Sequence, residues 1–163
     1  MPHPLLTQGD IDAFQRDGVI LVKGLFAAHV ETLRAGIARN MSAPGPYAAE
    51  NLKSGEAGRF FDDYCNWTHI PEFETVLRDS PAAAVAADLM ATQRVQMFHD
   101  HTLVKEPGTS KATPWHQDAA YWIDMPDKRA LSIWFAIDEA ILENGCMWYT
   151  PKSHKLPLRE HHQ

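Results

Sequence analysis

The hydrophobic residues in the first half of the chain recur at helical spacing. The first helix is predicted to begin after Thr7, which with Asp10 three residues later matches a capping box, and to end at Gly18. The next is predicted over residues 28–41, where apolar positions repeat every three or four residues. Another begins at Ser80-Pro81, because serine is a common N-cap and proline is favoured at the first helical position.

Alternation of apolar and polar residues, which is typical of strands, dominates the second half of the chain. Strands or extended segments are predicted at residues 19–22, 95–105, 114–122, 131–137 and 146–150. Between residues 47 and 71 the pattern is irregular, and its many aromatic residues indicate packed loops. Helices followed by strands predict an α+β, mainly β fold in which helices pack on an antiparallel sheet, as in a sandwich or jelly roll.

The composition is that of a soluble globular protein, since 45% of the 163 residues are hydrophobic and 22% are charged. A disordered chain, a collagen or a coiled coil is excluded, because the apolar fraction is high and no short repeat is present. No linker rich in Pro, Gly or Ser divides the chain. A single domain is therefore predicted over residues 1–163, mostly helical over 1–92 and built from strands over 93–163.

Charge and hydropathy exclude two classes of partner. The 15 basic and 21 acidic residues give a net charge of −6, and the basic residues are scattered, which argues against nucleic acid. No apolar run approaches the roughly 20 residues that span a bilayer, which argues against a membrane. The two cysteines form no disulfide framework and no secretory signal is visible, so a cytoplasmic protein is expected. A small molecule is the expected partner, and the oligomeric state cannot be read from the sequence.

Histidine, the commonest metal ligand, occurs nine times. In the segment 113–118, His116 and Asp118 are two residues apart, so on an extended strand both face one side and can bind one metal ion. The 2-His-1-carboxylate facial triad binds non-haem Fe(II) in this way and leaves positions open for a co-substrate and O₂. A surface strand that carries a chance His and Asp is the simpler interpretation of the spacing alone, and both interpretations stay open here.

A second pair, His99 and His101, would also share one strand face. Such pairs occur in zinc sites and in two-metal hydrolases. The simpler alternative is a pair of core histidines that are hydrogen-bonded to backbone groups or carboxylates. The sequence contains no Gly-rich phosphate loop and no Gly-x-Ser-x-Gly turn, so neither of those chemistries is indicated.

Four segments share the order and spacing of one known family. They are residues 14–26 (FQRDGVILVKGLF), 95–108 (VQMFHDHTLVKEPG), 113–122 (TPWHQDAAYW) and 130–155, the last with Asn-Gly and Pro-x-Ser-His turns. Together they resemble the phytanoyl-CoA dioxygenase family of Fe(II)/2-oxoglutarate oxygenases, in which the third segment binds iron. Residues 43–80 carry no matching motif. The resemblance implies a double-stranded β-helix (jelly roll, cupin-like) with N-terminal helices packed on it.

The resemblance also implies roles for individual residues. His116 and Asp118 correspond to the first two iron ligands, and Trp134 corresponds to a side chain beside 2-oxoglutarate. Ser132, two residues earlier, and His101, on the preceding strand, are further candidates for the 2-oxoglutarate pocket. The implied cofactor is Fe(II), with 2-oxoglutarate as co-substrate and O₂ as oxidant.

The implied reaction is hydroxylation of a small organic or acyl substrate. Related halogenases leave the carboxylate position empty so that halide can bind iron, and Asp118 fills that position here. Tyr121 and Trp122 follow the iron-binding segment directly and are predicted to line the substrate side. The sequence does not identify the substrate.

The sequence departs from the family toward its C-terminal end. The family's third iron ligand, a distal His, and the Arg that pairs with 2-oxoglutarate come well after the Pro-x-Ser-His turn. His161, His162 and Arg159 follow that turn too closely to take these places. We therefore expect the chain to be an N-terminal fragment with an incomplete jelly roll, inactive alone although the full-length protein is an enzyme.

Two other functions stay open at this point. The first is a Zn²⁺- or Mn²⁺-dependent hydrolase that uses His99, His101, His116 and Asp118 and needs neither O₂ nor 2-oxoglutarate. The second is a catalytically silent jelly-roll fragment, which would hold no metal.

Overall fold

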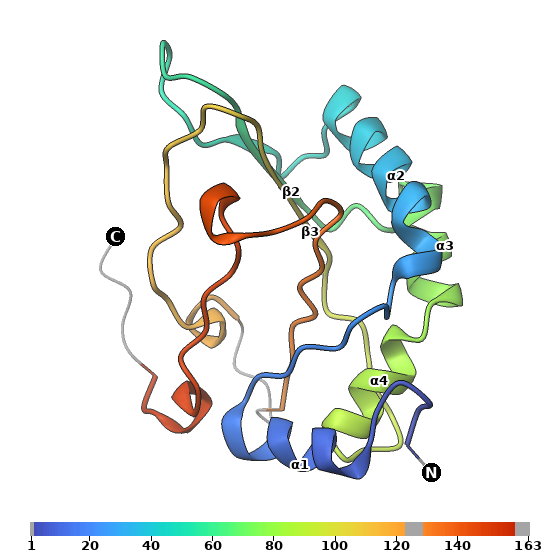
Figure 1. Cartoon of the computed structure of the whole chain (residues 1–163). Helices are drawn as coiled ribbons and strands as arrows, with labels where there is room; N and C mark the ends of the chain where they lie inside the picture. The colour runs from blue at the N-terminus through green and yellow to red at the C-terminus, as the bar shows by residue number, and fades with distance from the viewer. Residues whose placement is uncertain (1, 123–128, 159–163) are drawn as a thin grey trace. The chain divides into compact units, whose positions relative to one another are not determined.

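The computed structural model describes residues 2–122 and 129–158 (Figure 1). These residues belong to two compact units. The first unit comprises Met1–Leu25, Ala82–Val95 and Thr113–Gln163, and the second comprises Phe26–Pro81 and Gln96–Ala112. Among the described residues, no helix combines the length and the apolar character needed to cross a membrane.

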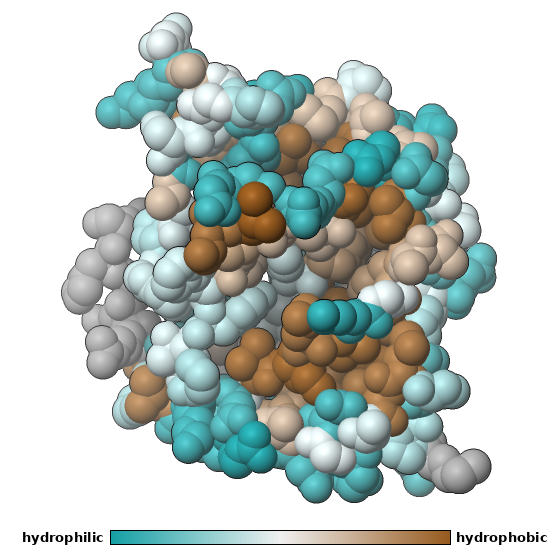
Figure 2. Space-filling view, viewed as in Figure 1, coloured by the Kyte–Doolittle hydropathy of each residue, from teal (hydrophilic) through white to brown (hydrophobic). Residues whose placement is uncertain are grey.

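Two helices pack together in the first unit, α1 (Gln8–Asp17) and α4 (Ala82–Leu89). The capping box predicted at Thr7 is confirmed: its hydroxyl accepts from the backbone N–H of Asp10 at 3.2 Å, and the Asp10 carboxylate accepts from the backbone N–H of Thr7 at 2.8 Å. Helix α4 is built from Ala, Val and Leu apart from one Asp, and it buries Val85. Figure 2 shows hydrophobic surface where this helix lies. Both helices were thus predictable from local signals.

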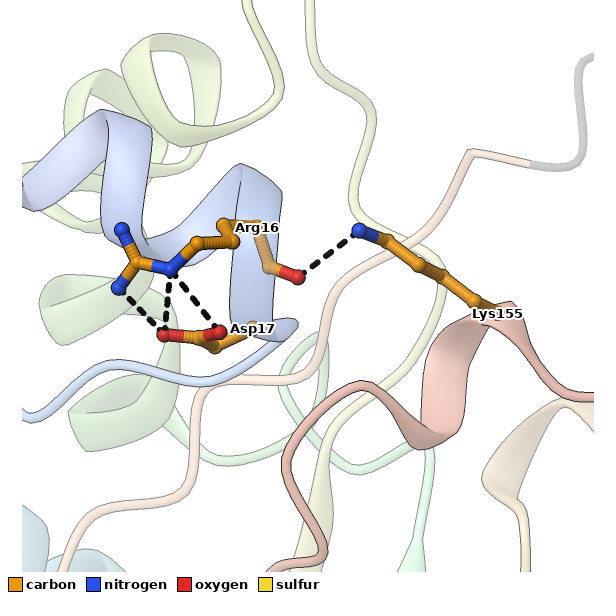
Figure 3. A network of polar contacts seen from close by, with 3 residues as sticks. All are labelled: Arg16, Asp17 and Lys155. Atoms are coloured by element: carbon orange, nitrogen blue, oxygen red, sulfur yellow. Dashed lines mark hydrogen bonds and ion pairs between the residues drawn. The ribbon is translucent and has the colours of Figure 1, made fainter.

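The C-terminal end of α1 is bound by the turn at residues 151–155. The backbone N–H of Lys152 donates to the carbonyl of Asp17 at 2.7 Å, and Nζ of Lys155 donates to the carbonyl of Arg16 at 2.9 Å. Figure 3 shows the Lys155 contact beside the 2.6 Å ion pair between Arg16 and Asp17. The last carbonyls of a helix carry partial negative charge, so the Lys155 ammonium stabilises this end. The turn therefore satisfies carbonyl groups that α1 leaves unpaired.

Residues 113–122 and 129–158 of the first unit form irregular chain with three short 3₁₀ helices. These are η2 (Asp118–Ala120), η3 (Leu142–Asn144) and η4 (Ser153–Lys155). The predicted strands at residues 19–22, 131–137 and 146–150 are wrong, since the described structure pairs none of them into a sheet. A strand is stable only when its backbone groups pair with a neighbour, so alternation without a partner gives irregular chain.

Several large side chains of those three segments are exposed to water, whereas Leu131, Ile133 and Ile137 are half-buried. Leu21 is 80% exposed, Trp148 is 65% exposed, and Trp134, Phe135 and Tyr149 are also on the surface. The apolar residues of the alternating segment 131–137 are thus only partly covered, and none of them is fully buried within the described residues. The double-stranded β-helix therefore stays an expectation for the family fold, and the observed structure is α+β with a small sheet.

The second unit holds a three-stranded antiparallel sheet in the order β1-β2-β3. Its strands are β1 (Ala49–Glu50), β2 (Phe60–Tyr64) and β3 (His101–Lys105). In the register of β2 and β3, Tyr64 is the partner of His101. The strand predicted at 95–105 is correct only for its last five residues, and β1 and β2 lie where the sequence predicts loops.

The helices of the second unit begin with η1 (Ala27–His29), which leads into α2 (Val30–Ser42) and confirms the helix predicted at 28–41. Helix α3 (Pro71–Asp79), which the sequence reading did not predict, packs on α2. The Phe73 ring occupies the space that a Cβ on Gly36 would need. The buried apolar residues of this unit include Leu33, Phe60, Phe61, Ile70, Phe73 and Val76.

A buried carboxylate joins three elements of the second unit. Asp63 of β2 is 0% exposed. Its Oδ2 accepts from Nδ2 of Asn40 and from the backbone N–H of Gly45, both at 2.7 Å, and its Oδ1 accepts from the backbone N–H of Tyr64 at 2.8 Å. Burial by itself raises the pKa of Asp63, but the hydrogen bonds to its charged form outweigh this and lower the pKa below the ordinary value.

Candidate functional site

His116 and Asp118 of the first unit lie side by side. Nε2 of His116 is 3.1 Å from Oδ1 of Asp118. The backbone between them is extended at Gln117, with φ −110° and ψ 119°, which turns both side chains to one side as the sequence predicts. The extended segment predicted at 114–122 ends there, because η2 begins at Asp118. Their side chains are 27% and 50% exposed, so both are accessible.

The imidazole of His116 is oriented by its own backbone neighbourhood. Nδ1 is 2.7 Å from the carbonyl oxygen of Pro114, which is an acceptor, so this contact assigns the ring proton to Nδ1. Nε2 faces the Asp118 carboxylate, so in the neutral ring the lone pair of Nε2 lies on that side. Metal-binding histidines commonly donate their second N–H to a carbonyl or carboxylate in this way.

The separation of the two facing atoms fits a metal ion. Ligands about 2.1 Å from an ion lie about 3.0 Å apart at neighbouring octahedral positions, and about 3.4 Å apart in a tetrahedron. The 3.1 Å between Nε2 of His116 and Oδ1 of Asp118 is closer to the octahedral value. Within the part of the chain that the structure describes, no third His, Cys, Asp or Glu joins the pair. The pair therefore fits as two ligands of an Fe(II) ion that keeps other positions open.

One further side chain contacts the Asp118 carboxylate, and the carboxylate in turn acts on a second. Oγ of Ser132, from the segment predicted as a strand, donates to Oδ2 of Asp118 at 3.0 Å. Burial, together with the negative charge of Asp118, raises the pKa of the Tyr149 hydroxyl. The sequence reading missed Tyr149, although a polar-tipped aromatic in a late alternating segment was a signal for it. It also missed the role of the Pro114 carbonyl, which no side-chain pattern reveals.

Of the aromatic residues predicted to lie near the site, Tyr121 contacts a candidate metal ligand. The Tyr121 ring stands edge-on to the His116 imidazole, with ring centroids 5.8 Å apart and an interplanar angle of 78°. Trp122 is half-buried and Trp134 is 44% exposed. Tyr121 therefore lies beside the candidate metal ligands, while the placement of Trp134 beside 2-oxoglutarate stays a prediction.

His101 belongs to a separate cluster in the second unit. Its Nε2 is 3.5 Å from Oδ2 of Asp62, and its ring stacks on Tyr64 with centroids 4.0 Å apart. Burial lowers the pKa of His101, although the Asp62 carboxylate acts in the opposite direction. His99 also lies near Tyr64, with ring centroids 6.1 Å apart. The four residues of the hydrolase alternative are thus divided between the two units, two in each.

Comparison with known proteins agrees with the motifs. The family model described as phytanoyl-CoA dioxygenase (PhyH) matches residues 14–163. Phytanoyl-CoA dioxygenase domain-containing protein 1 of Mus musculus is 25% identical over 192 residues, covering 91% of this chain and 66% of the relative. Ectoine dioxygenase of Stutzerimonas stutzeri is 26% identical, covering 91% of this chain and 51% of the relative. Dioxygenase lolE1 of Epichloe uncinata is 26% identical, with 94% and 61% covered.

These relatives are longer than the chain, which spans about two thirds of the mouse protein. No solved structure matches it. The family match extends through both units and includes the His116–Asp118 pair, which is the feature of the structure that bears most directly on chemistry.

Proposed function

This chain belongs to the phytanoyl-CoA dioxygenase family, and from that premise we propose that the full-length protein is a non-haem Fe(II)/2-oxoglutarate-dependent dioxygenase. We propose that it hydroxylates a small organic or acyl substrate. The observation that carries the proposal is the 3.1 Å separation of Nε2 of His116 and Oδ1 of Asp118, which suits two neighbouring ligands of one octahedral ion. A third ligand lies, on this proposal, outside the described residues.

Each residue of the pair has a defined task. His116 binds through Nε2, and its Nδ1–H donates to the Pro114 carbonyl, so the ring cannot rotate without losing a hydrogen bond. Asp118 supplies the anionic ligand through Oδ1. It favours hydroxylation, because it fills the carboxylate position that related halogenases leave empty for halide. When bound, Fe(II) and 2-oxoglutarate supply the O₂-activating oxidation, and the protein supplies orientation and exclusion of water.

The pocket around the ion is proposed from three residues of the first unit. Trp134 lines the 2-oxoglutarate side, as the family resemblance implies, whereas His101 lies in the second unit and its place beside 2-oxoglutarate stays a prediction. Tyr121 and Trp122 line the substrate side, and the edge-on contact of Tyr121 with His116 supports this place for Tyr121. With a net charge of −6, the chain has no evident basic patch that would bind the phosphates of an acyl carrier. The proposed substrate class is therefore a small organic or acyl compound.

Substitution of Asp118 tests the proposal in the full-length protein. Asp118→Ala is expected to abolish Fe(II)-dependent succinate formation from 2-oxoglutarate, because the ion loses its anionic ligand. Asp79→Ala is the matched control, since it removes the same charge from an exposed position at the end of α3 and leaves succinate formation intact. Turnover in Asp118→Ala equal to wild type contradicts the ligand assignment. Zn²⁺- or Mn²⁺-dependent hydrolysis without O₂ or 2-oxoglutarate contradicts the dioxygenase proposal itself and favours the hydrolase.

A further inference from the structure

The two oxygens of the Asp118 carboxylate have different partners. Oδ1 faces Nε2 of His116 at 3.1 Å. Oδ2 accepts a hydrogen bond from Oγ of Ser132 at 3.0 Å. Ser132 is 14 residues farther along the chain, so this contact is tertiary and not a consequence of local backbone geometry.

We propose that Ser132 is a positioning residue that holds Asp118 as a one-oxygen metal ligand. The proposal rests on the proposed function, because it takes the His116–Asp118 pair as the iron site. A carboxylate can bind an ion through one oxygen or through both. The hydrogen bond from Ser132 engages Oδ2 and keeps it from rotating toward the ion, so only Oδ1 is offered beside Nε2.

The number of oxygens that bind the ion matters for this chemistry. An octahedral ion has six positions, and a facial triad must leave three of them for a chelating co-substrate and O₂. A carboxylate that binds through both oxygens takes one of those three. Ser132 therefore preserves an open position without touching the ion.

The same contact gives Ser132 a role other than the one implied by the family resemblance. A serine hydroxyl has one proton to donate, and here that proton goes to Asp118. The carboxylates of 2-oxoglutarate are acceptors, so the Ser132 hydroxyl cannot donate to one of them while this bond exists. Ser132 thus acts on the ion through Asp118 and does not bind 2-oxoglutarate.

Residues that orient a metal ligand typically change metal affinity 10- to 100-fold when they are removed. A hydrogen bond between exposed side chains contributes little to folding, so variants of Ser132 are expected to fold. Thr and Val have nearly the same shape, and only Thr keeps a hydroxyl. Ser132→Thr and Ser132→Val therefore form a matched pair that separates the hydrogen bond from packing.

The experiment measures binding of Co²⁺, a spectroscopic substitute for Fe(II), to the full-length protein by absorption titration. Ser132→Val is expected to weaken Co²⁺ binding about 10-fold or more, and Ser132→Thr is expected to restore it to near the wild-type value. In the background of Asp118→Ala, Ser132→Val is expected to have no further effect, because its target is gone. Ser42→Ala, which removes a 2.8 Å hydroxyl hydrogen bond to the Arg39 carbonyl in α2, is the control and leaves Co²⁺ binding unchanged.

Three results would overturn the inference. Equal Co²⁺ affinity in Ser132→Val and Ser132→Thr, with binding lost in Asp118→Ala, refutes the role of Ser132 and leaves the proposed iron site standing. A weaker affinity for 2-oxoglutarate in Ser132→Val with unchanged Co²⁺ affinity shows instead that Ser132 binds the co-substrate. Failure of the wild-type protein to bind Co²⁺ refutes both the inference and the proposed function.

Discussion

Removal of the buried Asp63 carboxylate is expected to be strongly destabilising. Asp63→Ala removes the acceptor of three N–H donors: the Asn40 amide, which is 0% exposed, and the partly buried backbone N–H groups of Gly45 and Tyr64. An unsatisfied buried donor costs about 1–3 kcal/mol, and the partly buried donors cost less because water can reach them, so the sum is about 4 kcal/mol. This is a large part of the roughly 5–15 kcal/mol that stabilises a typical domain.

The assay is thermal and urea unfolding followed by circular dichroism. A loss of about 4 kcal/mol lowers Tm by about 8–16 °C in a protein of this size. Asp63→Asn is expected to lose less, because its amide oxygen can replace Oδ2 and accept from both Asn40 and Gly45. Its amide nitrogen then faces the N–H of Tyr64, where the carboxylate accepted a hydrogen bond.

The pH dependence supplies an independent check on the same carboxylate. The pKa of Asp63 is lower in the folded protein than its ordinary value of 3.8, so the stability it contributes is complete above that value. This contribution is lost as the pH falls from about the ordinary value through the folded pKa. Asp63→Asn is expected to lack this component of acid unfolding. Its pH profile is compared with that of the control Asp79→Ala, which removes an exposed carboxylate.

A loss below about 1 kcal/mol in Asp63→Ala would refute the reasoning, because a single unsatisfied donor already costs that much. An acid-unfolding profile of Asp63→Asn that matches wild type would refute the assignment of the pH-dependent component to Asp63. The two results are separate, since the first concerns the hydrogen bonds and the second concerns the charge.

Three smaller predictions concern the first unit. Gly18→Ala is expected to cost about 1–2 kcal/mol in urea unfolding, because Gly18 has φ +76° and the His154 ring fills the space of an added Cβ; no loss would contradict this packing. Thr7→Ala is expected to cost about 1 kcal/mol of the free energy of unfolding by removing the N-cap of α1. A thermal unfolding curve of this variant equal to that of wild type would contradict it. In Asp118→Asn, the pKa of Tyr149 is expected to fall toward its ordinary value while burial keeps it raised, as measured by ultraviolet titration against Tyr149→Phe; an unchanged pKa contradicts the proximity of Asp118.

Helix α1 is predicted correctly from signals at its ends, whereas α2 is predicted correctly from its hydrophobic periodicity. The capping box at Thr7 and the left-handed Gly18 define α1 without reference to any other segment. Helix α3 carries a similar signal, with Pro71 at its start and Glu72 and Glu74 in its first turn, but it directly follows a segment without periodicity and was not predicted. Capping signals and hydrophobic periodicity therefore each predict a helix here, and neither is sufficient for all of them.

The strands fail for the opposite reason, because a strand depends on a partner elsewhere in the chain. Phe60 and Phe61 begin β2 and are both buried, with two acidic residues following, so no alternation announces the strand. Residues 19–22 do look like a strand, yet Leu21 is 80% exposed and no partner pairs with it in the described structure. Alternation of apolar and polar residues gives a segment a tendency to form a strand, and pairing with a neighbouring strand decides whether the strand forms.

In the candidate site, too, some features follow from local sequence and others from tertiary contacts. His116 and Asp118 are two residues apart, so an extended backbone places both side chains on one side, as the spacing predicts, and there Nε2 and Oδ1 lie 3.1 Å apart. The partner of Oδ2 is a hydroxyl 14 residues away, in a segment whose alternation marks Ser132 only as a polar position. Spacing thus identifies the atoms that can bind an ion, whereas the geometry in which they bind it depends on a contact that only the folded chain creates. For this reason, metal-ligand motifs are easier to find in a sequence than the residues that orient those ligands.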